Sequence, residues 1–346
     1  MQPPSVRVVI PCFNHGAWVR DAVASALALE GARVEVVVVD DGSDDCLSPA
    51  ACDACAGPGV TVLHQPNGGL SAARNAGAAG ATTDYLAFLD ADDVLLPHFA
   101  RDLAAAIEAG GDDVSHAYGF EQVTGLHEYV WRCPPWDPVR MLITNLHPVT
   151  ALLRRDVFER SGGFDASLRT GHEDWEFWIR CIAMGCRGVR VEKPVFVWRR
   201  FSESSLLHTA LDAYEENVRK IVTRHADLYR EHALAIVERS LAMLHDADAT
   251  WLDEDYGAIH LRNARRWTQE LIGERDEARH QLEVAHREIA RLSHDLQHIR
   301  AEYEEKPMMR LSRALHERIE KLPTPLRTLS QGLVRAAARL APRRRT

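Results

Sequence analysis

Three carboxylates follow a short apolar run in this sequence. Residues 85–89 have the composition of a buried β-strand, and Asp90, Asp92 and Asp93 come directly after it. Like charges that gather at the end of a buried strand repel one another, so stability alone explains this cluster poorly. A divalent cation with oxygen ligands, such as Mg²⁺ or Mn²⁺, would balance the charge. The alternative is a solvated acidic loop that caps the next helix.

Two further polar clusters also follow strand-like runs. Asn14 comes after the apolar run at 6–10, and Asp40 with Asp41 comes after the run at 34–39. Strand and helix patterns alternate over the first third of the chain, which predicts an α/β fold with a mostly parallel sheet flanked by helices. Because binding sites in such folds form where strands end, we expect the polar clusters to carry the chemistry. Further strands are predicted at 60–63, 145–153 and 195–198, and helices at 18–29, 71–79, 155–161 and 173–184.

Composition is ordinary for a globular protein. The chain has 346 residues with 46% hydrophobic content, enough for two domains or for one large domain with appendages. Seven cysteines without a disulfide-framework spacing favour a reducing compartment, and the lone pair Cys52 and Cys55 is too isolated to indicate a zinc site. No signal peptide or membrane-spanning run is visible, so we expect a cytoplasmic protein.

The last third of the chain has a helical pattern, which divides into an extension at 206–262, a segment at 263–306 and a tail at 307–346. Apolar residues recur at heptad spacing over 271–303, which favours a dimeric coiled coil over a helix packed on its own domain. From residue 308 the tail carries a net charge of +8, against −17 for the rest. Its apolar and Arg-rich faces predict peripheral contact with an anionic membrane. A disordered tail is the alternative, and nucleic acid is disfavoured because no aromatic residues separate the arginines.

Six motifs in this order resemble the signature of family 2 glycosyltransferases with the GT-A fold. They occupy residues 9–14, 39–43, 67–75, 89–93, 162–165 and 172–175. The resemblance covers residues 5–205 and implies a GT-A domain at 1–205, with a Rossmann-like sheet. It implies an inverting enzyme that moves a sugar from a nucleoside diphosphate sugar, UDP or dTDP type favoured, to an acceptor hydroxyl. The helical C-terminal region lies outside the resemblance.

The resemblance also assigns residues to the donor nucleotide. Pro11 and Asn14 would shape the base pocket, and Asp40 would accept a hydrogen bond from the imide of uracil or thymine. Gly69 would allow the backbone to approach the donor closely. Arg74 would place a permanent positive charge beside the diphosphate. The alternative for Arg74 is an ordinary surface residue of a helix.

Four carboxylates take roles by the same resemblance. Asp90 would bind the ribose, and Asp92 would hold a Mg²⁺ or Mn²⁺ ion that bridges the diphosphate, with Asp93 sharing or replacing it as a ligand. Asp174 would act as the general base that deprotonates the acceptor hydroxyl. Its alternative is to cap the helix that begins there.

The sequence departs from the family pattern in two places. Phe201 stands where many members carry a histidine that can ligate the metal, and the Gln-x-x-Arg-Trp pattern of processive members is missing. Because the processive pattern is missing, we expect the transfer of one or a few sugars. Family habit and the basic tail favour a glycan or glycolipid acceptor in cell-surface polysaccharide, lipopolysaccharide or glycolipid assembly. Protein glycosylation and a catalytically idle scaffold organised by the coiled coil are the alternatives.

Overall fold

The computed structural model describes residues 3–200, 210, 213–245 and 291. Apart from residue 291, the predicted coiled coil at 263–306 and the basic tail at 307–346 lie outside these residues, and so does Phe201. Within the described part of the chain, no helix is both long enough and apolar enough to cross a membrane.

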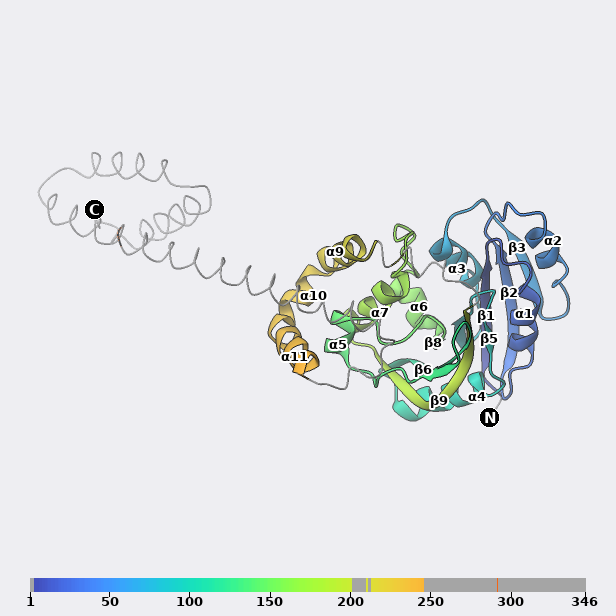
Figure 1. Cartoon of the computed structure of the whole chain (residues 1–346). Helices are drawn as coiled ribbons and strands as arrows, with labels where there is room; N and C mark the ends of the chain where they lie inside the picture. Colours follow the sequence, from blue (N-terminus) through green and yellow to red (C-terminus); the bar gives the residue numbers. More distant parts are fainter. Residues whose placement is uncertain (1–2, 201–209, 211–212, 246–290, 292–346) are drawn as a thin grey trace, which may run out of the picture. The chain divides into compact units, whose positions relative to one another are not determined.

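A mixed nine-stranded sheet forms the centre of the fold (Figure 1). Four strands in its N-terminal half are all parallel, in the order β3-β2-β1-β4. β1, β2 and β4 are rich in apolar residues and largely buried, as expected of strands covered on both faces, whereas β3 is mostly exposed. Their bounds are β1 Ser5–Cys12, β2 Arg33–Asp40, β3 Val60–His64 and β4 Tyr85–Phe88.

The second half of the sheet mixes directions. Strand β8 pairs antiparallel with both β4 and β6, whereas β6 and β9 run parallel to each other. The short β5 and β7 join β9 and β6 as antiparallel partners. Their bounds are β5 Val94–Leu95, β6 Val114–Gly125, β7 Tyr129–Trp131, β8 Leu152–Arg154 and β9 Arg187–Arg200.

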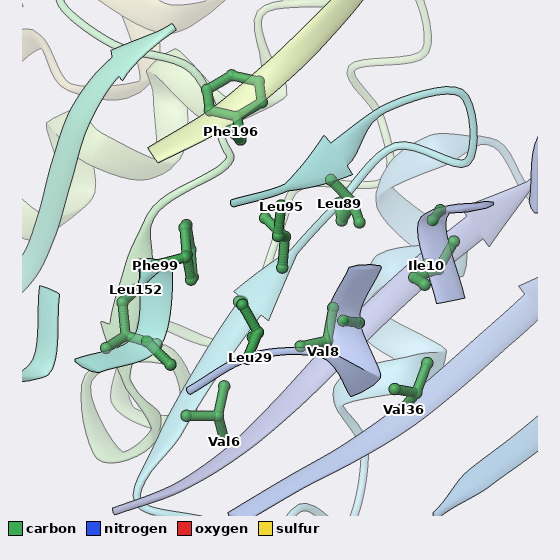
Figure 2. Close-up of a cluster of buried hydrophobic side chains, with 14 of the residues drawn as sticks. Val6, Val8, Ile10, Leu29, Val36, Leu89, Leu95, Phe99, Leu152 and Phe196 are labelled. Carbon is green, nitrogen blue, oxygen red and sulfur yellow. The ribbon is translucent and has the colours of Figure 1, made fainter. Parts of the chain in front are cut away.

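Side chains of β1 alternate between two packed layers, because successive residues of a strand point to opposite faces. Val8 and Ile10 belong to the main core, together with residues of α1 (Val19–Leu27) and α4 (Phe99–Gly110) (Figure 2). Val9 lies instead against α3 (Leu70–Ala78), on the other face of the sheet (Figure 1). The expected α/β architecture with helices on both faces is confirmed.

The remaining helices include those that carry the C-terminal half of the candidate site. α7 packs against α5, and α11 also contacts α5. α9, α10 and α11 lie within the predicted helical extension at 206–262. Their bounds are α2 Ser48–Asp53, α5 Pro138–Ile143, α6 Arg155–Ser161, α7 Glu173–Ala183, α9 Tyr214–Arg224, α10 Ala226–Glu231 and α11 Ala233–His245.

One predicted element is wrong over most of its length. The strand expected at 145–153 is reduced to β8, and the residues before it form a buried loop. Pro148 has no N–H for a sheet ladder, and the side chain of Asn145 bonds to Asp174 rather than lying on a sheet face. An apolar run within a buried loop looks like a strand to pattern analysis.

Candidate active site

The carboxyl ends of three neighbouring parallel strands, β2, β1 and β4, meet at one edge of the sheet, as the sequence predicts. The amide of Asp41, just after β2, donates to the carbonyl of Cys12 at 2.8 Å. The imidazole Nδ1 of His15, after β1, lies 3.7 Å from a carboxylate oxygen of Asp92, after β4. The loop from 90 to 93 is therefore next to the loop that follows β1.

The three carboxylates of the 90–93 loop differ in exposure. The side chains of Asp90 and Asp92 are 42% and 29% exposed, whereas Asp93 is buried. Burial, together with the negative charges of Asp90 and Asp92, raises the pKa of Asp93 well above its usual range. Its Oδ1 accepts the backbone N–H of Arg199 at 2.9 Å, which ties the loop to β9. This burial favours Asp92 over Asp93 as a metal ligand.

The donor set of this loop fits a hard divalent cation only in part. Asp90 and Asp92 present open carboxylate oxygens, which Mg²⁺ and Mn²⁺ prefer. Yet no group of three His, Cys, Asp or Glu side chains gathers as a metal site among the residues that the structure describes. Water or the oxygens of a bound ligand would have to complete the coordination of a cation held here.

Asp40 and Asp41 are both buried at the end of β2 and have separate partners. Asp40 accepts the Ser43 amide at 3.1 Å and lies 2.8 Å from Nδ1 of His64. Burial alone would raise the pKa of Asp40, but the bonds from Ser43 and His64 bring it below its ordinary value. Asp41 accepts the amide of Gly69 at 2.8 Å, and this glycine has φ of +87°.

Pro11 and Asn14 shape the start of the β1–α1 connection. Pro11 is buried within β1, whereas Asn14 is exposed and adopts a left-handed conformation with φ of 59°. The amide of Asn14 donates to the Ser43 hydroxyl at 3.0 Å, and its side chain exchanges hydrogen bonds with Asp44. Asn14 thus joins the loops that follow β1 and β2.

Arg74 is a buried bridge rather than a surface residue, so the alternative for this position is wrong. Only 1% of Arg74 is exposed. Its Nη2 donates to Asp90 at 2.8 Å and its Nη1 to Glu173 at 2.6 Å. Residues 90 and 173 lie far apart in the sequence, so Arg74 links the acidic loop after β4 to the start of α7.

Asp174 lies in the first turn of α7 and is half-buried. Its Oδ2 accepts the side-chain N–H of Asn145 at 3.0 Å, and its Oδ1 accepts the amide of Trp175 at 2.7 Å. Burial and the neighbouring Glu173 raise its pKa to about 7, against the opposing effects of Arg74, the Trp175 amide and Asn145. The N-cap position belongs to His172, so Asp174 does not occupy the helix-capping position.

Three residues of this region were not expected from sequence. Glu173 forms the buried ion pair with Arg74, Asn145 holds Asp174, and Asn217 of α9 contacts the turn before α7. Glu173 stands directly beside the predicted base, but the sequence predicts no role of its own for it. Asn145 and Asn217 sit in segments whose patterns gave no motif, so only the long-range packing identifies them.

Comparison with known proteins relates the N-terminal part of this chain to glycosyltransferases. Residues 7–162 match the sequence model of glycosyl transferase family 2. An uncharacterized glycosyltransferase of Rickettsia prowazekii is 26% identical over 224 residues, covering 62% of this chain and 69% of that protein. The succinoglycan biosynthesis protein ExoO of Rhizobium meliloti is 38% identical over 113 residues, 32% of each chain.

The fold has its own relatives among solved structures. The crystal structure of S. aureus TarS 1–349 in complex with UDP-GlcNAc matches with a TM-score of 0.52 and 18% identity, over 74% of this chain and 70% of that one. This likeness supports the GT-A assignment of the sheet and its helices. The family model matches residues 7–162, which is less than half of the chain. Together with the relatives named as glycosyltransferases, this match identifies the chain as a glycosyltransferase.

Proposed function

We propose that this glycosyltransferase is an inverting, metal-dependent enzyme that uses a nucleoside diphosphate sugar of the UDP or dTDP type. The observation that carries the proposal is the link through Arg74. The guanidinium joins Asp90, at the predicted donor side, to Glu173, which directly precedes the predicted base Asp174. A donor bound over the acidic loop would therefore lie beside a carboxylate whose pKa suits proton transfer near neutral pH.

On the donor side, the chain's own residues would bind and orient the nucleotide. Pro11 and Asn14 form the wall of the base pocket. Asp40 stands behind it, and a carboxylate oxygen that already accepts one bond can accept a second from an imide N–H. The amide of Gly69 is held by Asp41, so the backbone there is preorganised beside the donor.

The acidic loop would hold the ribose and the diphosphate. Asp90 has an exposed side chain that can accept from a ribose hydroxyl, and Asp92 would ligate Mg²⁺ or Mn²⁺, with Asp93 in a supporting position. When bound, the cation neutralises the charge that develops on the departing diphosphate. Arg74 holds Asp90 in place through a charge-assisted hydrogen bond.

Asp174 would accept the proton of the acceptor hydroxyl. As that proton leaves, the acceptor oxygen forms a bond to the anomeric carbon, and the bond from this carbon to the diphosphate oxygen breaks. Attack from the face opposite the leaving group inverts the anomeric configuration. Asn145 fixes one oxygen of Asp174 and the Trp175 amide fixes the other, so the carboxylate is held in a defined orientation.

A glycan or glycolipid is the proposed acceptor, because the relative in Rhizobium meliloti is named for succinoglycan biosynthesis. We further propose a homodimer through 271–303 and a cytoplasmic location, with the basic tail at 307–346 contacting the inner face of the membrane. A protein acceptor and an idle scaffold are the competing functions. Turnover of a donor sugar excludes the scaffold, and release of product into the lipid or polysaccharide fraction excludes the protein acceptor.

A donor screen tests whether turnover of a nucleoside diphosphate sugar depends on a divalent cation. Release of nucleoside diphosphate is measured from UDP-, dTDP- and GDP-sugars with Mn²⁺, Mg²⁺ or EDTA, for the wild type and for Asp92→Ala. We expect turnover of one donor that stops with EDTA and falls at least about 100-fold in Asp92→Ala, because charge on the leaving group is then unbalanced. Turnover that is equal with EDTA would contradict metal dependence. Asp112→Ala, in an exposed turn, is a matched control.

The pH dependence of transfer tests the role of Asp174. A general base must be unprotonated, so kcat/KM should fall about tenfold per pH unit below the raised pKa of about 7 and level off above it. Rates are measured from pH 5 to 9, with UDP binding followed by calorimetry over the same range. Calorimetry separates Asp174 from the histidines near the nucleotide. A rate that stays level down to about pH 5, as an aspartate of ordinary pKa would give, would contradict the assignment.

A further inference from the structure

A strained turn precedes the helix that carries the proposed base. Gly171 has φ of +101° and His172 has φ of 65°. A positive φ is uncommon for a residue with a Cβ, so His172 keeps it only because the surroundings hold it. The carbonyl of His172 accepts the amide of Glu176 at 3.0 Å, an early hydrogen bond of α7. The conformation of this turn therefore sets the orientation of α7 and the position of Asp174 in its first turn.

Asn217 of α9 holds the turn with a side chain that is fully buried. Its Oδ1 accepts the Thr170 hydroxyl at 3.0 Å. Its Nδ2 donates to the carbonyl of Gly171 at 3.3 Å and lies 3.3 Å from Nδ1 of His172. One amide thus bonds to three consecutive residues, and it needs both its donors and its acceptor to do so.

Two ring contacts also join α9 to the turn and to the first turn of α7. The ring of Tyr214 meets His172 edge-on at 5.2 Å and stacks against Trp175 at 6.3 Å. Burial lowers the pKa of His172 to about 4, so its imidazole is neutral and can accept from Asn217. At the other end of α9, His225 Nε2 lies 2.9 Å from Glu176 of α7.

We propose that Asn217 is a positioning residue for catalysis, which acts through the 170–172 turn to hold Asp174 against the acceptor. The inference rests on the proposed function of Asp174 as the base. α9 lies beyond the 7–162 stretch that matches the family model, so this support comes from a part of the chain outside that match. α9 contacts the turn that precedes Asp174, whereas the donor side is built on β1, β2 and β4.

Two variants of different severity test this role. Asn217→Asp keeps the shape and removes the donors, and Thr170→Val removes only the hydroxyl bond. With the donor that the screen identifies, we expect kcat to fall roughly 10- to 100-fold in Asn217→Asp and by less in Thr170→Val, since small misplacements of a catalytic group are costly. UDP affinity by calorimetry should change less than about twofold. Glu216→Gln is the control, because Glu216 is exposed on the same helix.

Two further readouts separate positioning from general stability. Amide hydrogen exchange of the 170–176 segment should accelerate in Asn217→Asp while exchange in β1 and β2 stays unchanged. In an Asp174→Asn background, Asn217→Asp should cause no further loss of turnover, because residues that act as a unit are not additive.

The possible outcomes separate the positioning role of Asn217 from the role of Asp174 as the base. If Asp174→Asn is inactive and both turn variants turn over like wild type, the positioning role is wrong and the base assignment stands. If the turn variants lose UDP affinity and melting temperature together with kcat, Asn217 is a structural residue and the proposal also fails. If Asp174→Asn itself stays fully active, Asp174 is not the base and the proposed function is contradicted.

Discussion

Asp174→Asn should lower kcat by about 100- to 10,000-fold, the usual contribution of a general base, while leaving donor affinity almost unchanged. The amide has nearly the same shape as the carboxylate but cannot take up the acceptor's proton. Asn145 and the Trp175 amide both donate to Asp174, so the substituted side chain can satisfy only one of these donors with its remaining carbonyl oxygen. The position lies beside the buried pair of Arg74 and Glu173 and carries no bond to it, so the fold should survive.

The measurement is steady-state transfer with the identified donor, together with UDP calorimetry and a melting curve. Replacing this half-buried carboxylate should change the melting temperature only slightly, because burial disfavours its ionised form while one hydrogen-bond donor loses its partner. Asp156→Asn, on the exposed face of α6, serves as the matched control. A drop in turnover of less than about threefold would rule out Asp174 as the base. The acid limb of the pH profile should also disappear from the residual activity.

Local sequence patterns predicted the N-terminal, parallel half of the sheet. The strands β1, β2 and β4 are short apolar runs, and each is followed by a polar cluster, so their common edge could be anticipated. The ordered motifs added the connection between Asn14, Asp40 and the acidic loop. The contact of Asn14 with Ser43 and the approach of His15 to Asp92 show that these loops do meet.

The second half of the sheet and the long-range contacts of the site were predicted less completely, for a physical reason. β6 contains His116 and Glu121, both buried, so its polar residues disrupted the apolar pattern of a strand. The buried loop before β8 had the opposite problem and looked like a strand. The pairs Arg74 with Glu173 and Asn217 with Gly171 join residues far apart in the chain, and no local spacing encodes such contacts.

The burial of Arg74 gives its charge a different role from the one predicted from the sequence. The sequence suggested a cation beside the diphosphate, and the structure shows a guanidinium already bonded to two carboxylates. A buried charge pair gains little over apolar residues of the same shape, but losing one partner leaves an uncompensated charge in the interior. Arg74 therefore links the stability of the domain to the geometry of the site.

Arg74→Met should lower the free energy of unfolding by about 3–5 kcal/mol, because it leaves Glu173 buried without its cation. The loss is measured by urea denaturation at pH 7.5. Adding Glu173→Gln should recover part of it, since the unpaired charge is then removed. Arg160→Met breaks an exposed pair with Asp156 and should cost less than about 1 kcal/mol.

Arg74→Met should also move the acid limb of the pH profile of activity. Arg74 lowers the pKa of Asp174, so its removal should shift the limb to higher pH in whatever enzyme remains folded. Adding Glu173→Gln should bring the limb back down, because Glu173 raises that pKa. A loss of stability with an unmoved limb would mean that Arg74 supports the fold without tuning the base. A stable Arg74→Met protein would contradict the buried bridge itself.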